Sequence, residues 1–289
     1  MNQLAPHTPQ TSNAKSTAPI LARLGFTRPQ DEKPVLHSAA LTGGDPKLFF
    51  TVDDIEVPIH DMRPVTAGFD LDREGFKLAV HPTQVADLYD EDAVLGTYYA
   101  EISEMLTEAF GASRVGIFDH TRRSDSGTGA PNKDGSRGPA GRVHVDYTEG
   151  SGPVRAADAL GREEVDRILS TGGRILQVNV WRPITGPVRR APLALADATT
   201  VSPDDLLATD QVFPGRVGEI YQVAHNPAQR WYWAPEMTRN EVLLIKGWDS
   251  LNDGRSKFTP HGAFTLPDQD PNAAPRESIE VRTFVVIEG

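Results

Sequence analysis

The sequence predicts a mainly β protein with flanking helices, built on a double-stranded β-helix of the jelly-roll or cupin type. The 289 residues include 25 Gly and 23 Pro, a content typical of many short strands joined by turns. Helical periodicity is confined to the first 170 residues or so, and short strands separated by turn signals follow it. We expect residues 1–43 to be a flexible tail and residues 44–289 to form a single jelly-roll domain.

The first half of the chain supplies the tail and the clearest helix. Residues 1–28 are rich in Pro, Thr, Ser, Asn and Gln and contain no long apolar run, which predicts a mobile segment. Strands are expected at 47–56 and 76–80. Leucine and aromatic residues then recur every three to four positions, which predicts a helix at 82–110.

The middle of the chain is expected to alternate between short strands, a loop and a helix. A strand is predicted at 114–119 and another at 142–147, separated by a polar Gly-, Ser- and Arg-rich loop at 121–141. A helix at about 156–170 ends at Gly172 and Gly173.

The remainder is predicted to be mostly β. The segment 191–208 should cover the sheets and include a helical turn at 202–205. Turn signals such as Asn226-Pro227 separate the expected strands, which are 174–182, 218–225, 231–234, 241–248, 262–266 and 278–288.

Composition excludes several classes of partner and site. A net charge of -11 argues against nucleic acid or an anionic membrane surface as a partner. The chain has no cysteine, so a metal must be held by histidine and carboxylate side chains. No run approaches the roughly 20 apolar residues that a membrane span needs. We expect a cytoplasmic protein with a small-molecule substrate, and the sequence leaves a homodimer open.

Two distant segments predict a metal site. In the expected strand His144-Val145-Asp146, side chains 144 and 146 point to the same face, about 7 Å apart along the strand. His261 begins a late strand and can supply a third ligand. Two histidines and one carboxylate suit a non-haem iron(II) that keeps coordination positions open for a 2-oxoacid and dioxygen. The alternative is that His144 is an ordinary hydrogen-bonded strand residue.

A possible anchor for the co-substrate follows His261 in the sequence. Arg276 and Ser278 share one strand face, where a guanidinium and a hydroxyl can hold the distal carboxylate of 2-oxoglutarate. Arg282 is the rival anchor, about 20 Å farther along the same face. The hydroxyl of Ser278, on the same face as Arg276, favours Arg276 over Arg282 as the anchor. His225 competes with His261 as a ligand but adjoins a turn and has no Arg-x-Ser at a suitable distance.

Polar residues of the strand at 174–182 are candidates for the pocket. Alternation puts Gln177, Asn179 and Trp181 on one face, where Asn179 can hydrogen-bond the 2-oxoacid or the substrate and Trp181 can line the pocket. The alternative for this face is a solvent-exposed sheet edge. Arg182 is a candidate for binding a substrate carboxylate, and a surface ion pair is its alternative.

Other candidates lie farther along the chain or in the polar loop. Tyr221 and Trp233 belong to an aromatic hairpin that can line an apolar substrate site or pack in the core. Lys246 interrupts an apolar strand, so it is either a second carboxylate anchor or a partner of Asp249. The basic residues of the loop at 121–141 are solvated or fold over the substrate; they are Arg122, Arg123, Lys133 and Arg137.

At these positions the chain also resembles the hydroxylase/desaturase family of secondary metabolism, which includes fungal hydroxylase/desaturases and bacterial cephem-methoxylation accessory proteins. The resemblance extends from about Leu48 to the C-terminus. It implies a jelly-roll oxygenase with His144, Asp146 and His261 as iron ligands and Arg276 as the 2-oxoglutarate anchor. The blocks that carry it are HVDYT (144–148), NVWRP (179–183), KGWDS (246–250), PHGAF (260–264) and RESIEVR (276–282).

The predicted function is therefore an iron(II)- and 2-oxoglutarate-dependent dioxygenase. It would hydroxylate, desaturate or cyclise a secondary metabolite or an amino-acid-derived molecule. Asp146 fills the position that a halide would need, which argues against halogenation. Two alternatives stay open, namely a non-catalytic accessory protein on the same fold and a cupin-type dioxygenase that does not use 2-oxoglutarate.

Overall fold

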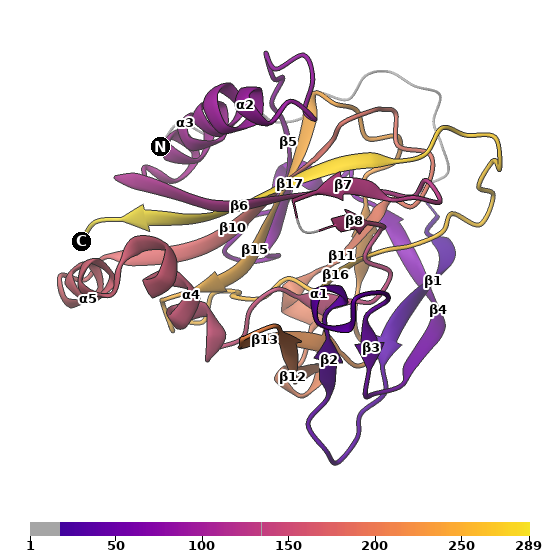
Figure 1. The fold of residues 1–289 in the computed structure, drawn as a ribbon, viewed down its shortest axis with the longest axis horizontal. Helices are drawn as coiled ribbons and strands as arrows, with labels where there is room; N and C mark the ends of the chain where they lie inside the picture. The colour runs from indigo at the N-terminus through magenta and orange to yellow at the C-terminus, as the bar shows by residue number, and fades with distance from the viewer. Residues whose placement is uncertain (1–17, 134) are drawn as a thin grey trace.

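The computed structural model describes residues 18–133 and 135–289 and consists mainly of two sheets that face each other (Figure 1). The larger, curled sheet has ten strands in the order β1 (Ile20–Thr27), β4 (Val52–Asp61), β14 (Trp231–Trp233), β11 (Leu193–Ala196), β16 (His261–Ala263), β9 (His144–Val145), β13 (Arg216–Val223), β12 (Leu206–Phe213), β2 (Val35–His37) and β3 (Lys47–Leu48). The smaller sheet has five strands in the order β5 (Phe76–Val80), β15 (Glu241–Asp249), β10 (Arg174–Pro183), β17 (Glu277–Ile287) and β6 (Arg114–Ser124).

Helices cover the outer face and one end of the smaller sheet (Figure 1). A short hairpin of β7 (Ala130–Asn132) and β8 (Gly135–Arg137) follows β6. The helices are α1 (Ala39–Thr42), α2 (Glu91–Ala93), the π-helix η2 (Val94–Tyr98), α3 (Tyr99–Phe110), α4 (Ser151–Leu160) and α5 (Arg162–Ser170), with 3-10 turns η1 (Thr66–Gly68), η3 (Ala198–Thr200) and η4 (Pro203–Asp205).

Strand alternation divides β10 between two environments. Leu176, Val178 and Val180 face outward and pack against α3 in one apolar core. Trp181 faces the larger sheet and packs between the sheets in a second core. Burying an apolar side chain of this size contributes about 1.5–3 kcal/mol, so the two cores hold β10 firmly at the centre of the molecule. The inward face of β10 is therefore available to build a site on a rigid support.

The structure corrects the predicted tail. Residues 20–27 form β1, which pairs with β4 along its whole length, from Ile20 opposite Ile59 to Thr27 opposite Val52. Leu24 and Phe26 are buried in the core of the larger sheet, and this burial explains why a segment close to a polar stretch is ordered. Residues 35–42 also form elements, β2 and α1. Residues 1–17 of the predicted tail lie outside the described residues.

Three other element predictions also need correction. The helical region begins only at Glu91, because the Asp90 side chain accepts the backbone N–H groups of Asp92 and Ala93 and caps it. The predicted loop at 121–141 contains the end of β6 and the β7–β8 hairpin. Strand β12 at 206–213 was not predicted, whereas the helical turn at 202–205 is confirmed as η4.

Lys246 lies in a buried ionic cluster rather than at a carboxylate-binding site. Its ammonium group is fully buried and donates to Asp72 at 2.6 Å, to Asp249 at 3.0 Å and to the Ser256 carbonyl at 3.0 Å. These three acceptors use its three hydrogens, so the anchor role is wrong and the partnership with Asp249 is confirmed. The Lys246 carbonyl accepts the Thr259 N–H at 3.1 Å, and the cluster thereby fixes the segment that leads into β16.

We predict that Lys246→Met lowers the free energy of unfolding by about 3–5 kcal/mol, because it leaves Asp249 buried with one cation fewer. Lys33→Met is the matched control, since Lys33 bridges Asp210 and Glu219 at the surface and its removal should cost less than about 1 kcal/mol. Urea denaturation of the purified variants measures both. Equal losses in the two variants would contradict the structural role of Lys246.

Candidate metal centre

Three potential metal ligands, two on strands of the larger sheet and one just after β9, converge on one point. His144 of β9 and His261 of β16 are direct partners in the antiparallel register, with ring centroids 4.6 Å apart. His144 Nε2 lies 3.6 Å from Asp146 Oδ1. One ligand atom from each residue lies within 4.8 Å of the other two. Among residues 18–133 and 135–289, this is the one group of three or more such side chains close enough to hold an ion.

Both imidazoles are oriented by backbone carbonyls. His144 Nδ1 lies 2.9 Å from the Arg142 carbonyl oxygen, and His261 Nδ1 lies 3.0 Å from that of Thr259. A carbonyl can only accept, so each Nδ1 carries the hydrogen and each Nε2 keeps a lone pair for a metal. Burial, together with the neighbouring His144, lowers the pKa of His261 and favours the neutral ring that a metal ligand requires.

Asp146 is held through one of its oxygens. Its Oδ2 accepts from Asn179 Nδ2 at 2.7 Å and lies 3.5 Å from Arg282 Nε, which leaves Oδ1 facing His144. Gln177 in turn donates to the Asn179 amide oxygen at 2.5 Å. Burial alone would raise the pKa of Asp146, but Arg282 and His144 outweigh it and hold that pKa well below its ordinary value. The carboxylate is therefore ionised and fixed in place.

A small cavity of about 20 Å³ adjoins the two histidines and contains a buried, under-bonded arginine. Arg276 is 3% exposed, and its Nε and Nη2 have no hydrogen-bond partner among the described residues. Its guanidinium carbon lies 5.8 Å from the centroid of a Trp181 ring. Burial and the nearby Arg123 lower the pKa of Arg276 to about 10, a value at which it still carries its charge at neutral pH. A buried cation without hydrogen-bond partners is suited to an anionic ligand.

The two candidate anchors differ in how their donors are used. Arg282 Nη1 donates to Asp119 and Thr121, both at 2.9 Å, and its Nη2 lies 2.7 Å from Glu280 Oε1. Protein acceptors therefore occupy Arg282, whereas Arg276 has donors to spare. Ser278 is buried near the start of β17 and Arg276 lies just before that strand, but Ser278 is not among the residues that line the cavity.

Arg182 and His225 are placed away from the centre. Arg182 is fully buried and donates to the Tyr98 hydroxyl at 2.9 Å, the Arg239 carbonyl at 2.6 Å and His81 Nδ1 at 2.9 Å. This bonding corrects both roles considered for it, the substrate anchor and the surface ion pair. The ring of His225 packs against Phe26 at 5.1 Å, in keeping with its lower rank as a ligand.

The aromatic candidates separate into one at the cavity and two in packing contacts. Trp181 lines the small cavity together with both histidines. The Tyr221 ring packs edge-on against Phe258 at 5.1 Å, and Trp233 packs edge-on against Phe264 at 5.7 Å. Neither Tyr221 nor Trp233 lines the cavity. Trp233 packs in the core of the larger sheet, as the core-packing alternative has it, whereas Tyr221 is only partly buried.

Sequence reasoning did not find several residues that complete the centre. Arg123 and Glu280 line the small cavity, and Arg282 meets Asp146 rather than a co-substrate site. Strand alternation from Arg276 onward does place Glu280 and Arg282 on the inward face, so that signal was present. The contact of Asn179 with Asp146 joins residues 33 positions apart in different sheets, and no local pattern encodes it.

Comparison with known proteins places this geometry in a family. A family described as an oxidoreductase/YMDC permease-like domain matches residues 24–286. The hydroxylase/desaturase efuI of Hormonema carpetanum is 34% identical over 250 residues, which cover 79% of this chain and 82% of efuI. The Fe(II)/2-oxoglutarate-dependent dioxygenase nvfI of Aspergillus novofumigatus is 32% identical over 238 residues, covering 80% of this chain and 82% of nvfI.

A solved structure of a related enzyme has the same fold as this chain. The iron and alpha-ketoglutarate-dependent endoperoxidase NvfI superposes with a TM-score of 0.82 at 27% identity, over 95% of this chain and 100% of NvfI. The predicted jelly-roll fold is thereby confirmed. Within the described residues, no helix combines the length and the apolar character needed to cross a bilayer. The chain therefore belongs to the hydroxylase/desaturase family that includes these Fe(II)/2-oxoglutarate-dependent dioxygenases, and it is an oxidoreductase.

Proposed function

We propose that this protein is an Fe(II)- and 2-oxoglutarate-dependent oxygenase that hydroxylates, desaturates or cyclises a small organic molecule. His144, Asp146 and His261 would hold the iron, and Arg276 would bind the distal carboxylate of 2-oxoglutarate. The observation that carries the proposal is the convergence of these three ligands beside a buried guanidinium whose Nε and Nη2 have no hydrogen-bond partner among the described residues.

The residues present fit an iron(II) ion. Two imidazoles whose Nδ1 atoms are held by backbone carbonyls and one ionised carboxylate form the donor set of non-haem iron oxygenases, which keeps coordination positions open. When bound, the iron activates dioxygen while 2-oxoglutarate is converted to succinate and carbon dioxide. The absence of cysteine leaves histidine and carboxylate as the ligands that the chain can offer.

The surrounding residues orient these groups. Asn179 was expected to contact the 2-oxoacid or the substrate, and we now assign it to holding Asp146 Oδ2 so that Oδ1 faces the metal. Arg282 compensates the charge of the same carboxylate. Trp181 forms a wall of the cavity, beside Arg276. Ser278 stays a proposed second contact for the co-substrate carboxylate.

Two alternatives make different use of Arg276. A non-catalytic accessory protein needs neither the ligand set nor the unpaired guanidinium, and the relatives named as dioxygenases support catalysis instead. A cupin-type dioxygenase without 2-oxoglutarate would find Arg276 dispensable. We propose a secondary metabolite or an amino-acid-derived compound as substrate, because relatives are named hydroxylase/desaturase and one solved structure is an endoperoxidase.

We predict that His261→Ala and Asp146→Ala abolish stoichiometric iron binding and succinate formation, since either change removes one of three ligands. His225→Ala is the matched control, because its ring lies against Phe26. Iron content after anaerobic loading and succinate release measure the two properties. Full iron loading and turnover in either ligand variant would disprove the assignment.

We predict that Arg276→Met weakens 2-oxoglutarate binding by roughly 30-fold or more, because a charge-assisted bond to the carboxylate is lost. The same change should leave the fold intact or raise its stability, since it removes a buried cation that lacks partners. Arg182→Met, which removes an equally buried but fully bonded guanidinium, should instead destabilise the fold.

Anaerobic titration of iron-loaded protein with 2-oxoglutarate, followed by its visible charge-transfer band, measures the affinity, and urea denaturation measures the stability. Unchanged affinity in Arg276→Met would disprove Arg276 as the anchor, and the absence of a band in the wild-type protein would favour the oxygenase that does not use 2-oxoglutarate.

A further inference from the structure

Two arginines, rather than one, face the cavity beside the candidate iron ligands. Arg123 of β6 lines this cavity of about 20 Å³ together with Arg276 and both histidines, His144 and His261. The function proposed above uses Arg276 and gives Arg123 no role. Two guanidinium groups beside so small a space make its wall strongly positive, and this charge calls for a ligand that balances it.

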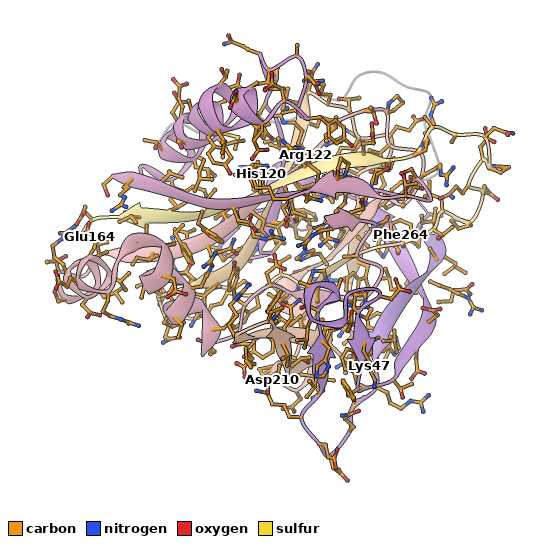
Figure 2. The ribbon with its side chains drawn as sticks, in the orientation of Figure 1. Lys47, His120, Arg122, Glu164, Asp210 and Phe264 are labelled. Atoms are coloured by element: carbon orange, nitrogen blue, oxygen red, sulfur yellow. The ribbon has the colours of Figure 1, made fainter. Side chains whose placement is uncertain are left out.

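Strand alternation explains why Arg123 points toward the larger sheet while its neighbour Arg122 does not. Arg122 donates to the Leu88 carbonyl at 2.7 Å and lies 3.1 Å from Glu91, on the side of the smaller sheet that the helices cover. Figure 2 shows Arg122 close to His120 at the edge of that sheet, beneath the helical region. Because successive side chains of a strand point to opposite faces, Arg123 lies on the inward face.

The pairing of β6 with β17 places Arg123 beside the proposed anchor. Arg123 is directly opposite Ser278, and Arg276 lies two residues before Ser278. Directly opposite residues have Cβ atoms about 4.5–5.5 Å apart, and diagonal neighbours are about 7–8 Å apart. Arg282, which contacts Asp146, pairs with a β6 residue four positions before Arg123, about 13 Å along the strand. The backbone of Arg123 is therefore level with the Arg276 end of the strand pair.

Neither guanidinium forms an ion pair with a described residue. The Arg123 side chain donates one hydrogen bond there, from Nη1 to the Gly138 carbonyl at 3.0 Å. Arg276 Nε and Nη2 have no acceptor among the same residues. The carboxylate that lines the cavity belongs to Glu280, and it already lies 2.7 Å from Arg282. The cavity wall thus contains two cations that no adjacent carboxylate balances.

Arg123 and Arg276 are close enough to repel each other. Burial lowers the pKa of Arg276, and among the neighbouring charges Arg123 lowers it most. Two like charges held at one desolvated cavity cost free energy until an anion binds between them. A carboxylate can accept charge-assisted hydrogen bonds from two guanidiniums at once. The distal carboxylate of 2-oxoglutarate, assigned above to Arg276, is an anion of this kind.

We propose that Arg123 is a second binding residue for 2-oxoglutarate, and that the distal carboxylate lies between the guanidiniums of Arg123 and Arg276. This inference rests on the proposed oxygenase function and deepens it, because it explains how the site selects a 2-oxo diacid over a 2-oxo monoacid. A monoacid leaves the two repelling cations unbalanced, whereas the diacid neutralises them.

The first test compares two 2-oxoacids with the same five-carbon chain. 2-Oxopentanoate has a methyl group where 2-oxoglutarate has its distal carboxylate. In iron-loaded protein without oxygen, Arg123→Met should weaken 2-oxoglutarate binding about tenfold, because a charge-assisted contact is lost, and should not weaken 2-oxopentanoate binding. The charge-transfer band measures both affinities. Arg114→Met is the matched control, since Arg114 also lies on β6 but its nearest carboxylate is Glu164 at the surface, 3.9 Å away.

The possible results separate this inference from the function on which it rests. Unchanged 2-oxoglutarate affinity in Arg123→Met would overturn the inference. Equal weakening of both ligands would also overturn it, because Arg123 would then contact the carboxylate that the two ligands share. A wild-type protein that shows no band with 2-oxoglutarate would instead refute the proposed oxygenase function, and this inference with it.

The second test uses full-length protein without metal or ligand and distinguishes a binding role from a structural one. Arg123→Met should have a more favourable effect on the midpoint of urea denaturation in the wild-type background than in Arg276→Met, where the repelling neighbour is already gone. Equal effects in the two backgrounds would contradict the shared cavity charge. A loss of stability as large as that of Arg182→Met would show that Arg123 supports the fold, and would likewise overturn the proposal.

Discussion

The carboxylate of Asp146 is the group on which the site depends, because it lies between the two sheets and contacts both. It follows β9 of the larger sheet, and its Oδ2 meets Asn179 of β10 and Arg282 of β17 in the smaller sheet. A buried anion between sheets is tolerated only where hydrogen bonds and a counter-charge compensate its desolvation. The same contacts that compensate it also fix the direction of Oδ1. Fold and ligand geometry are thereby set by one group of interactions.

Buried cations in this protein fall into two kinds. Lys246, Arg182 and Arg282 have partners for their donors and connect strands or loops. Arg276 differs, because its Nε and Nη2 are buried and no described residue accepts from them. Folding gains nothing from such a group, so its retention in the cavity is best explained by a ligand that supplies the missing acceptors. The distinction between structural and binding cations thus follows from which donors have acceptors rather than from burial, because Arg276 is as buried as Lys246 and Arg182.

How far the sequence predicts this protein depends on the range of each interaction. Alternation along a strand is local, so the shared faces of His144 with Asp146 and of Gln177 with Asn179 and Trp181 could be predicted. The order of β1 could not, because it arises from pairing with β4 and from burial of Phe26. The roles of Arg182 and Lys246 also depended on partners distant in the sequence, such as Tyr98 and Asp72, which no periodicity reveals.

The segments that sequence patterns described least well line a cavity of about 340 Å³ at the edge of β6. Leu95 lies in the π-helix η2, in a region predicted to be regular α-helix, and Lys133 and Arg137 lie in or beside the β7–β8 hairpin, in a region predicted to be a loop. π-Helical turns are frequent at functional sites, and edge strands and hairpins tolerate change that a buried core does not. The candidate iron ligands, by contrast, lie on or next to paired strands of the larger sheet. The candidate metal centre is therefore held by strand pairing, whereas the wall of this cavity is built from a π-helical turn and an edge hairpin.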